Sequence, residues 1–167
     1  MAVEVNRKPH WSDVLLERLR SGRGSAISGQ KRGRGVEDLA EEIIRGVFKN
    51  QYAKRCNFIG ARRIEAKCDF AVPSKTEPRI VIEAKAYGAT GSKMTDIIGD
   101  IEKIISAKRQ DTAFLFFTDG LPWRQRESDL RKIVNYQNQG DITRIYTLAT
   151  LPELRADLLT LKEEFGL

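Results

Sequence analysis

Two acidic residues and a lysine in the middle of the chain have the types and spacing of a metal site. Asp69 is followed downstream by Glu83 and Lys85, which are separated by a single residue. Mg²⁺ binds oxygen ligands and keeps water molecules, so one or two carboxylates completed by a substrate phosphate make an ordinary site for it. The alternative interpretation is a common cross-strand Glu–Lys pair on an exposed sheet.

The strand expected at residues 78–87 determines how Glu83 and Lys85 point. Alternate side chains of a strand leave opposite faces, so these two residues share one face. The other face carries only Ile80, Ile82, Ala84 and Ala86. That face can pack against a helix. Asp69 falls in a preceding extended segment at 63–72. Strands joined by a modest loop usually pair as neighbours, which would place Asp69 beside Glu83.

An amphipathic helix expected at residues 36–49 adds a further carboxylate. At about 100° per residue, one sector contains the apolar residues of this segment. They are Val36, Ala40, Ile43, Ile44, Val47 and Phe48. Glu37 falls inside this sector, whereas Glu41 lies at its edge and Asp38 and Glu42 face away. A glutamate on the inward side of a helix needs a reason.

The remaining elements follow from hydrophobic periodicity and turn signals, and together they predict an α/β fold. We expect a short helix capped by Ser12, an extended segment at 55–60, helices at 94–108, 124–137 and 152–164, a buried strand at 112–120 and a further strand at 142–148. This order of helices and strands fits a central mixed β-sheet flanked by helices.

Basic residues are concentrated at the start of the chain. Residues 1–35 hold eight Lys and Arg residues against three acidic ones, a net of +5 out of +6 for the whole chain. We predict two regions: a basic helix and Gly/Arg-rich loop at 1–35 that meets a polyanion, and a core at 36–167. A solvated, flexible tail is the alternative for the first region. The candidate contacts in this region are Arg23, Lys31, Arg32 and Arg34.

Two later segments offer further contacts for a polyanion. Ser92, Lys93 and Thr95 precede or open a helix, whose N-terminal amides would bind phosphate. Ser92 would equally serve as the N-cap of that helix, and both roles are compatible. Arg124 and Arg126 follow the apolar strand after a turn and are candidates for the same role.

Composition excludes several classes of function. The only histidine, His10, lies near the N-terminus, and Cys56 and Cys68 lack metal-binding spacing, so neither a zinc site nor a histidine-based mechanism is expected. No GxxxxGK[ST] loop is present for ATP hydrolysis. No apolar run reaches the roughly 18 residues of a membrane span, and no export signal is visible. We therefore expect a cytoplasmic protein with no membrane partner.

The stretches VEDLAEEII, KCDFAVPS and IVIEAKAYGATGSKMTDIIGDI resemble the PD-(D/E)xK nuclease superfamily, and within it the small type II restriction endonucleases. The resemblance covers roughly residues 20–165. In that family a helix carries an acid, and the strands that follow carry an acid and an acid-x-Lys pair. The matching positions here are Glu37, Asp69, Glu83 and Lys85. Cys68 stands where the motif has a proline that ligates nothing.

The resemblance implies a restriction-endonuclease-like fold and a role for each residue. Asp69 and Glu83 would bind Mg²⁺, with Mn²⁺ as a substitute. Lys85 would orient or activate the attacking water and offset charge on the phosphate. Glu37 would contact a second metal ion or its water. The alternative for Glu37 is a buried ion pair with an arginine such as Arg62 or Arg63.

The activity implied is Mg²⁺-dependent hydrolysis of phosphodiester bonds in double-stranded DNA by a type II restriction endonuclease. A homodimer acting at a short palindrome is expected, because cutting both strands needs two active sites. A DNA methyltransferase would be the genetic partner. The alternatives are a structure-selective nuclease for junctions or repair intermediates, a non-catalytic DNA-binding module, and a basic RNA- or ribosome-associated domain.

Overall fold

The computed structural model describes residues 35–86, 97–119 and 127–167. Within these ranges the chain forms one sheet and four longer helices. The helices are α3 (Val36–Phe48), α4 (Ile97–Ala107), α5 (Glu127–Gln139) and α6 (Leu151–Phe165). The strands are β1 (Ala53–Ile59), β2 (Glu65–Val72), β3 (Ile80–Lys85), β4 (Ala113–Thr118) and β5 (Arg144–Thr147). Short 3₁₀ segments lie at Ala61–Arg63 and Leu148–Thr150.

The sheet is mixed, with strand order β1-β2-β3-β4-β5. The strands β1, β2 and β3 pair antiparallel, whereas β3, β4 and β5 pair in parallel. Parallel neighbours need a crossover connection, and α4 and α5 lie in the two connections that join the parallel strands. The predicted α/β fold with a mixed sheet flanked by helices is confirmed, and it is compatible with a restriction-endonuclease-like fold.

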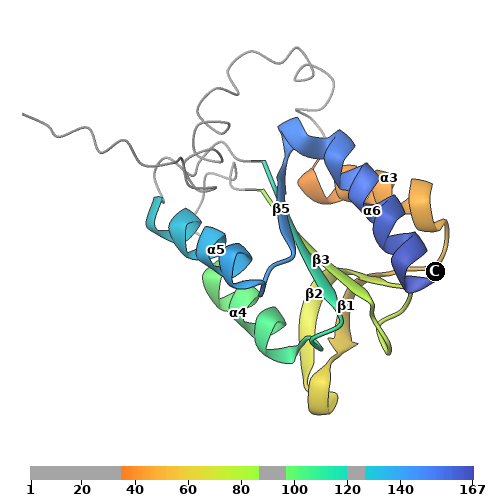
Figure 1. Cartoon of the computed structure of the whole chain (residues 1–167), viewed down its shortest axis with the longest axis horizontal. Helices are drawn as coiled ribbons and strands as arrows, with labels where there is room; N and C mark the ends of the chain where they lie inside the picture. The colour runs from red at the N-terminus through yellow and green to blue at the C-terminus, as the bar shows by residue number, and fades with distance from the viewer. Residues whose placement is uncertain (1–34, 87–96, 120–126) are drawn as a thin grey trace, which may run out of the picture.

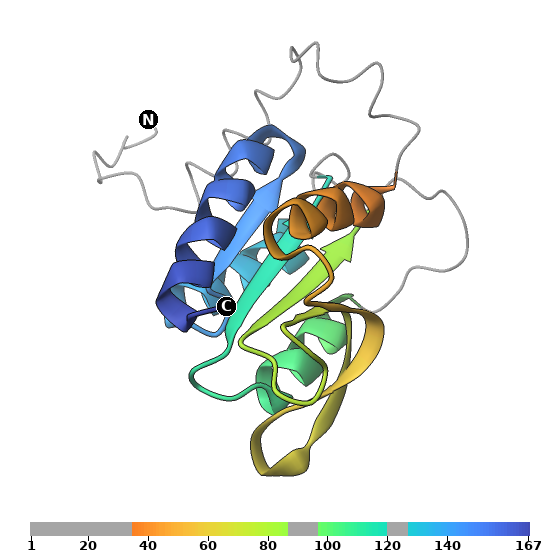
Figure 2. The same ribbon diagram turned by 90° about the vertical axis from the view of Figure 1, so that its right-hand side faces the viewer.

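Helices cover both faces of the sheet (Figures 1 and 2). One hydrophobic core lies between the sheet and α4 and α5, and a second lies between the sheet and α3 and α6. Strand β3 divides its side chains between them as predicted. Ile80, Ile82 and Ala84 pack with α3 and α6, and Val81 packs with α4 and α5. The face of β3 that carries Glu83 and Lys85 is therefore the face turned toward α4.

Most predicted boundaries agree with the observed elements to within about three residues. The apolar run expected at 112–120 is β4, which is buried along its whole length, as expected for a central strand. The last helix, expected at 152–164, is α6, with Pro152 in its first turn as the sequence suggests. The helix expected near Ser12 lies outside the described residues. No helix in the described ranges is both long and apolar enough to cross a membrane.

The β1–β2 hairpin changes its side-chain alternation midway. Cys68 and Ala71 both pack in the core beneath α4, although strict alternation would put them on opposite faces. On β1, Arg55 has a φ of 46°, a left-handed conformation that is rare inside a strand for a residue other than glycine. Beyond this point the hairpin reaches α4, where Gly60 lies against the carbonyl of Ala107.

Candidate active site

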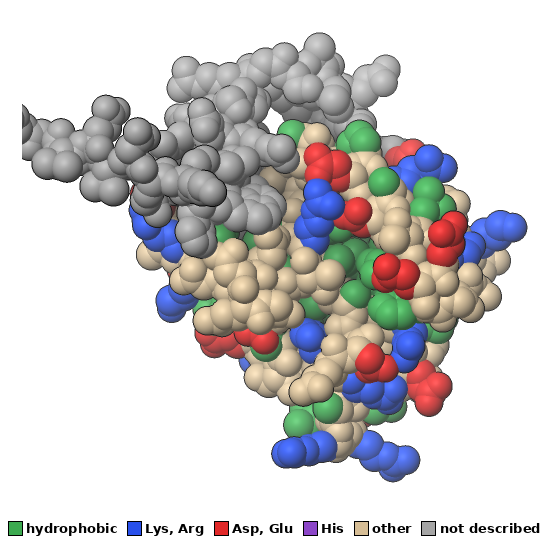
Figure 3. All heavy atoms as spheres, viewed as in Figure 1, with side chains coloured by type: hydrophobic (Ala, Val, Ile, Leu, Met, Phe, Trp, Pro, Cys, Tyr) green, Lys and Arg blue, Asp and Glu red, His purple; other side chains and the backbone are tan. Residues whose placement is uncertain are grey.

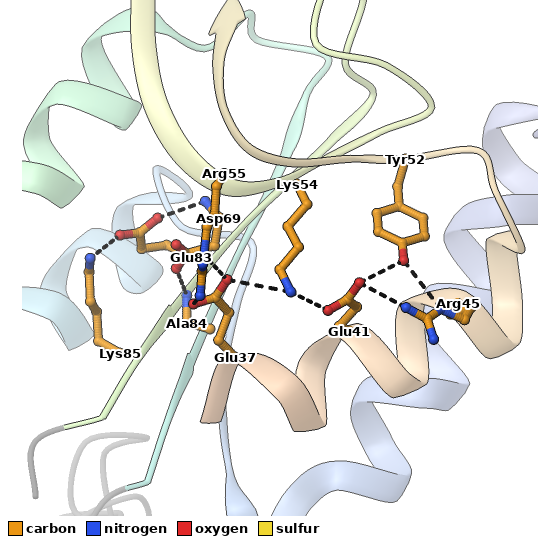
Figure 4. Close-up of polar contacts among 10 residues, drawn as sticks. All are labelled: Glu37, Glu41, Arg45, Tyr52, Lys54, Arg55, Asp69, Glu83, Ala84 and Lys85. Atoms are coloured by element: carbon orange, nitrogen blue, oxygen red, sulfur yellow. Dashed lines mark hydrogen bonds and ion pairs between the residues drawn. The ribbon is translucent and has the colours of Figure 1, made fainter. Parts of the chain in front are cut away.

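Asp69 and Glu83 lie side by side where β2 and β3 stop forming a regular ladder. The last regular pair is Phe70 with Ile82, so Asp69 and Glu83 occupy the next position along the same register. The Asp69 amide donates to Glu83 Oε2 at 3.2 Å, and the Ala84 amide donates to Asp69 Oδ2 at 2.8 Å. Figure 4 shows the two carboxyl groups in this arrangement. The predicted adjacency of the two acids is confirmed.

Lys85 completes a compact charged group on the face of β3 that is turned toward α4. Its Nζ lies 2.7 Å from Glu83 Oε1 and 3.9 Å from Oδ2 of Asp100, in the first turn of α4. Glu83 is only 4% exposed, so this pair differs from the ordinary exposed Glu–Lys pair considered as the alternative. The sequence prediction did not include Asp100. The sequence feature that could have indicated Asp100 is its position in the first turn of the helix that follows the Glu-x-Lys strand.

Burial and like charge oppose ionisation of the two acids. Burial and, after it, the neighbouring Asp69 charge raise the pKa of Glu83, and Lys85 acts in the opposite direction; the net result is a pKa of about 7. Burial also raises the pKa of Asp69, against the hydrogen bond from the Ala84 amide. Burial disfavours the charged form of Lys85, but the surrounding carboxylates outweigh this effect and raise its pKa. Lys85 therefore stays protonated beside Glu83, and a bound cation would help both acids to ionise.

The chemistry of this group fits a hard divalent cation. Asp69, which is half-buried, and Glu83, which is buried, offer adjacent carboxylate oxygens, and a bound cation would relieve their mutual repulsion. Within the described ranges, no group of three or more His, Cys, Asp and Glu side chains is arranged to hold a metal ion. Two carboxylates are enough for Mg²⁺, which keeps several waters and shares its remaining positions with substrate phosphate.

Glu37 lies in the first turn of α3 and pairs with Arg55 of β1. The Nε of Arg55 donates to Glu37 Oε1 at 2.7 Å, and its Nη2 donates to Glu37 Oε2 at 2.9 Å. The inward position predicted for Glu37 is explained by this bidentate contact at the sheet edge (Figure 4). The alternative of an ion pair with an arginine is therefore the one observed, with Arg55 as the partner; Arg62 and Arg63, given as examples of that arginine, lie in the turn between β1 and β2.

A second acid of α3, Glu41, also pairs with cations, and it lies farther from the Asp69–Glu83 pair than Glu37 does (Figure 4). Glu41 accepts from Arg45 Nη2 and from the Tyr52 hydroxyl, both at 3.0 Å, and forms a close ion pair with Lys54. The hydrogen bond from Lys54 is the main reason why the pKa of Glu41 is lowered. Lys54 and Arg55 are consecutive, yet both reach α3. The φ of 46° at Arg55 is the local feature associated with this break in alternation.

Sequence reasoning therefore missed Arg55, because alternation along a regular strand would turn it away from Lys54 and α3. A positive φ at a residue other than glycine cannot be predicted from the pattern of apolar residues. The residues predicted to contact DNA all lie outside the described ranges. They are Arg23, Lys31, Arg32, Arg34, Ser92, Lys93, Thr95, Arg124 and Arg126.

The described surface gives no broad area of one charge on the face seen in Figure 3, where basic and acidic side chains are interspersed. This agrees with the sequence, in which residues 36–167 contain 21 basic and 20 acidic residues, a net of +1. Attraction of a polyanion to this face would therefore depend on particular cations rather than on net charge.

Comparison with known protein families gives a match over most of the chain. The family model described as DpnII restriction endonuclease matches residues 27–153, well over half of the chain. The matched region includes α3, all five strands and the group formed by Asp69, Glu83 and Lys85. Searches of curated proteins and of solved structures give no significant match.

Proposed function

Because this chain belongs to the DpnII restriction endonuclease family, we propose that it is a Mg²⁺-dependent type II enzyme that hydrolyses phosphodiester bonds in double-stranded DNA. The observation that carries this proposal is the adjacent Asp69–Glu83 pair with Lys85 beside it, inside the matched region. A metal-dependent nuclease needs acidic ligands for the cation and a group that orients or activates the attacking water. Asp69 and Glu83 would supply the first, and Lys85 would supply the second.

Asp69 and Glu83 would hold the cation. Restriction endonucleases usually need a divalent metal, and Mg²⁺ is our proposal for this chain, with Mn²⁺ as a substitute. When bound, the cation would act as a Lewis acid that stabilises charge on the phosphate and makes water more acidic. The amide of Ala84 fixes the Asp69 carboxyl by donating to its Oδ2, so this acid is oriented before any substrate arrives.

Lys85 would supply positive charge to the reacting phosphate. Its pKa is raised by the Glu83, Asp69 and Asp100 carboxylates despite its burial, so the ammonium keeps its proton over the physiological range. A charged ammonium can donate to the attacking water and to a phosphate oxygen whose negative charge grows in the transition state. Asp100, at 3.9 Å from Lys85 Nζ, would limit the directions in which this side chain points.

Glu37 is the outer carboxylate of the proposed site. We expected it to contact a second metal ion or its water. Both of its oxygens accept from Arg55, so direct coordination would require this pair to open. The observed contact favours the ion-pair alternative, with Arg55 as the partner.

We further propose that the basic region at 1–35 and the segments around 92–95 and 124–126 contact the duplex, as the sequence predicts. A homodimer would supply the two active sites needed to cut both strands. A DNA methyltransferase that protects the host sequence would be encoded nearby.

A plasmid digest tests the proposal. We expect discrete fragments with Mg²⁺ and none with EDTA, and sequencing of the fragment ends would give the recognition site. Lys85→Ala should reduce the cleavage rate by about 100-fold or more. Lys103→Ala is the matched control, because Lys103 is exposed on α4 and pairs with the same Asp100 at 3.7 Å. Loss of cleavage in both variants would contradict the role of Lys85.

The digest, repeated with branched DNA and combined with binding measurements on duplex DNA and RNA, also separates the alternatives. Cutting of branched DNA alone would favour a structure-selective nuclease with the same fold. Tight duplex binding without Mg²⁺-dependent cleavage would favour a non-catalytic DNA-binding module. Equal affinity for RNA without hydrolysis would favour an RNA-associated domain.

A further inference from the structure

We propose that Arg55 is a ligand for a backbone phosphate of the DNA, and that Glu37 holds its guanidinium group ready for this contact. The inference rests on the proposed nuclease function and adds a substrate-binding residue to it. Four observations carry it: the geometry of the Arg55–Glu37 pair, its exposure, the backbone conformation of Arg55 and its position opposite Asp69.

The pair with Glu37 uses only part of the guanidinium group. Arg55 donates through Nε and Nη2, at 2.7 Å and 2.9 Å. A guanidinium group has five N–H donors in one plane, so three remain, and one N–H of Nη1 and the second N–H of Nη2 form another edge. That edge matches two phosphate oxygens, and an arginine can hold a carboxylate and a phosphate at the same time.

The Arg55 side chain is 65% exposed, so a phosphate could reach it without displacing the protein around it. An ion pair with this exposure contributes little to stability. Glu37 is better screened from solvent, at 22% exposed. The more buried acid therefore acts as the anchor, and the more exposed arginine presents its outer edge to solvent.

The backbone at Arg55 is in an unfavourable conformation. Its φ of 46° lies in the left-handed region, which a long side chain rarely adopts inside a strand. Such strain persists where the rest of the structure imposes it, and it is concentrated at functional sites. Here the strain occurs where Arg55 turns toward Glu37. Because this ion pair is largely exposed, its contribution to stability is too small to account for the strain.

Arg55 lies across the β1–β2 ladder from Asp69. The flanking register pairs are Lys54 with Phe70 and Cys56 with Cys68, so Arg55 and Asp69 occupy the position between them. A phosphate bound to a cation held by Asp69 and a phosphate bound to Arg55 would therefore belong to the same stretch of DNA backbone. Lys54 is less suited to this role, because its ammonium group is already paired with Glu41.

The test is duplex binding in EDTA, which prevents Mg²⁺-dependent cleavage and makes the readout independent of activity. Fluorescence anisotropy with a labelled mixed-sequence duplex would be measured over a range of salt concentrations. Arg55→Gln should weaken binding by about 5-fold to 50-fold and reduce the slope of log K against log salt by about one. The matched control is Arg45→Gln, which removes the same charge and also breaks a pair with a glutamate of α3. It should change the affinity by less than about 2-fold.

Three further variants separate phosphate binding from a structural role. Arg55→Gly removes the side chain but suits the positive φ, so it should fold as well as the wild type and still bind weakly. Arg55→Lys keeps the charge without the planar fork and should fall between the wild type and Arg55→Gln. Glu37→Gln should lower affinity to a smaller extent, because the arginine remains but is no longer held by an ionised partner.

The outcomes distinguish this inference from the proposed function. If the wild type cleaves and binds DNA while Arg55→Gln and Arg45→Gln lose affinity equally, the phosphate contact is wrong and the pair with Glu37 is structural. The same conclusion follows if Arg55→Gly binds as tightly as the wild type. If the wild type neither binds duplex DNA nor cleaves it with Mg²⁺, the proposed function fails and the Arg55 contact fails with it.

Discussion

The Glu83 carboxyl is 4% exposed and lies next to the Asp69 carboxyl, so its charged form loses hydration and meets a like charge. Its pKa is raised to about 7, mainly by burial, from an ordinary value of 4.5. A raised pKa in the folded state means that the folded protein binds this proton more tightly than the unfolded chain does. The group therefore stabilises the fold below about pH 4.5, and this contribution is lost as the pH rises through about 7.

We therefore predict that Glu83→Gln stabilises the metal-free protein at pH 8 by about 1–3 kcal/mol while abolishing cleavage. The amide keeps the size of the side chain and removes the charge. Urea unfolding in EDTA between pH 4.5 and 8 would measure the difference in the free energy of unfolding between Glu83→Gln and the wild type. The control is Glu65→Gln, which makes the same change at an exposed position of β2. A stability difference that does not grow between pH 5 and 7 would contradict the electrostatic explanation.

At the residue scale, the sequence was sufficient to predict the contacts of a side chain where regular strand geometry determines which way the side chain points. Glu83 and Lys85 share a face because a strand alternates, and Asp69 meets Glu83 because neighbouring strands pair. The partner of Glu37 could not be predicted in the same way. It depends on the φ of Arg55, which is set by tertiary structure rather than by local propensity.

At the element scale, the β1–β2 hairpin depends on one close contact with α4. A Cβ added at Gly60 would lie 1.8 Å from the carbonyl oxygen of Ala107 and 2.6 Å from its carbonyl carbon. These are backbone atoms at the end of a helix and cannot move aside like the end of a flexible side chain. The hairpin or α4 would have to shift, and Asp69 is part of that hairpin.

We predict that Gly60→Ala destabilises the protein by about 2–4 kcal/mol. Gly46→Ala makes the same change inside α3, where an added Cβ meets nothing within 4 Å, and should stabilise by about 0.5–1 kcal/mol. Urea or thermal unfolding of both variants measures the contrast. Equal effects at the two positions would show that the close approach to Ala107 is not a constraint.

The elements themselves followed from sequence because their periodicity is strong. The stripe predicted for the first core helix is largely buried in α3, and Leu39 joins it. The bend of the hairpin over α4 was not predictable, because Gly60 carries no hydrophobic signal and its close neighbour Ala107 is distant in sequence. Packing at such a contact depends on the three-dimensional arrangement of two elements, which a local pattern does not contain.

For the whole molecule, charge separates two regions of the chain. Residues 1–35 carry a net of +5, whereas residues 36–167 carry 21 basic against 20 acidic residues, a net of +1. Attraction to a polyanion scales with the number of phosphates neutralised, so the first region should supply most of the salt-dependent affinity. The described core would then contribute the catalytic group and a few directed contacts.

Replacing Arg23, Lys31, Arg32 and Arg34 together with Gln should weaken duplex binding about 10-fold to 1000-fold at low salt and lower the salt slope by up to about four. The control variant replaces four exposed cations of the core, Lys49, Lys75, Lys132 and Arg155, for the same change in net charge. Anisotropy titrations of both variants in EDTA would compare them. Similar losses in the two would indicate an effect of net charge alone, and the region 1–35 would not be a specific contact.

The sheet joins its antiparallel and parallel parts at β3, and this has a consequence for how the enzyme folds. The β2–β3 pairing links segments that are close along the chain, whereas β3–β4 and β4–β5 pair only after a helix has crossed between them. Closing a longer loop loses more chain entropy, and non-local pairings slow folding. We therefore expect Asp69 and Glu83 to meet early on the folding pathway. Mutations that delay the docking of α5 and α6 would then reduce the yield of folded enzyme while leaving the catalytic rate of each folded molecule unchanged.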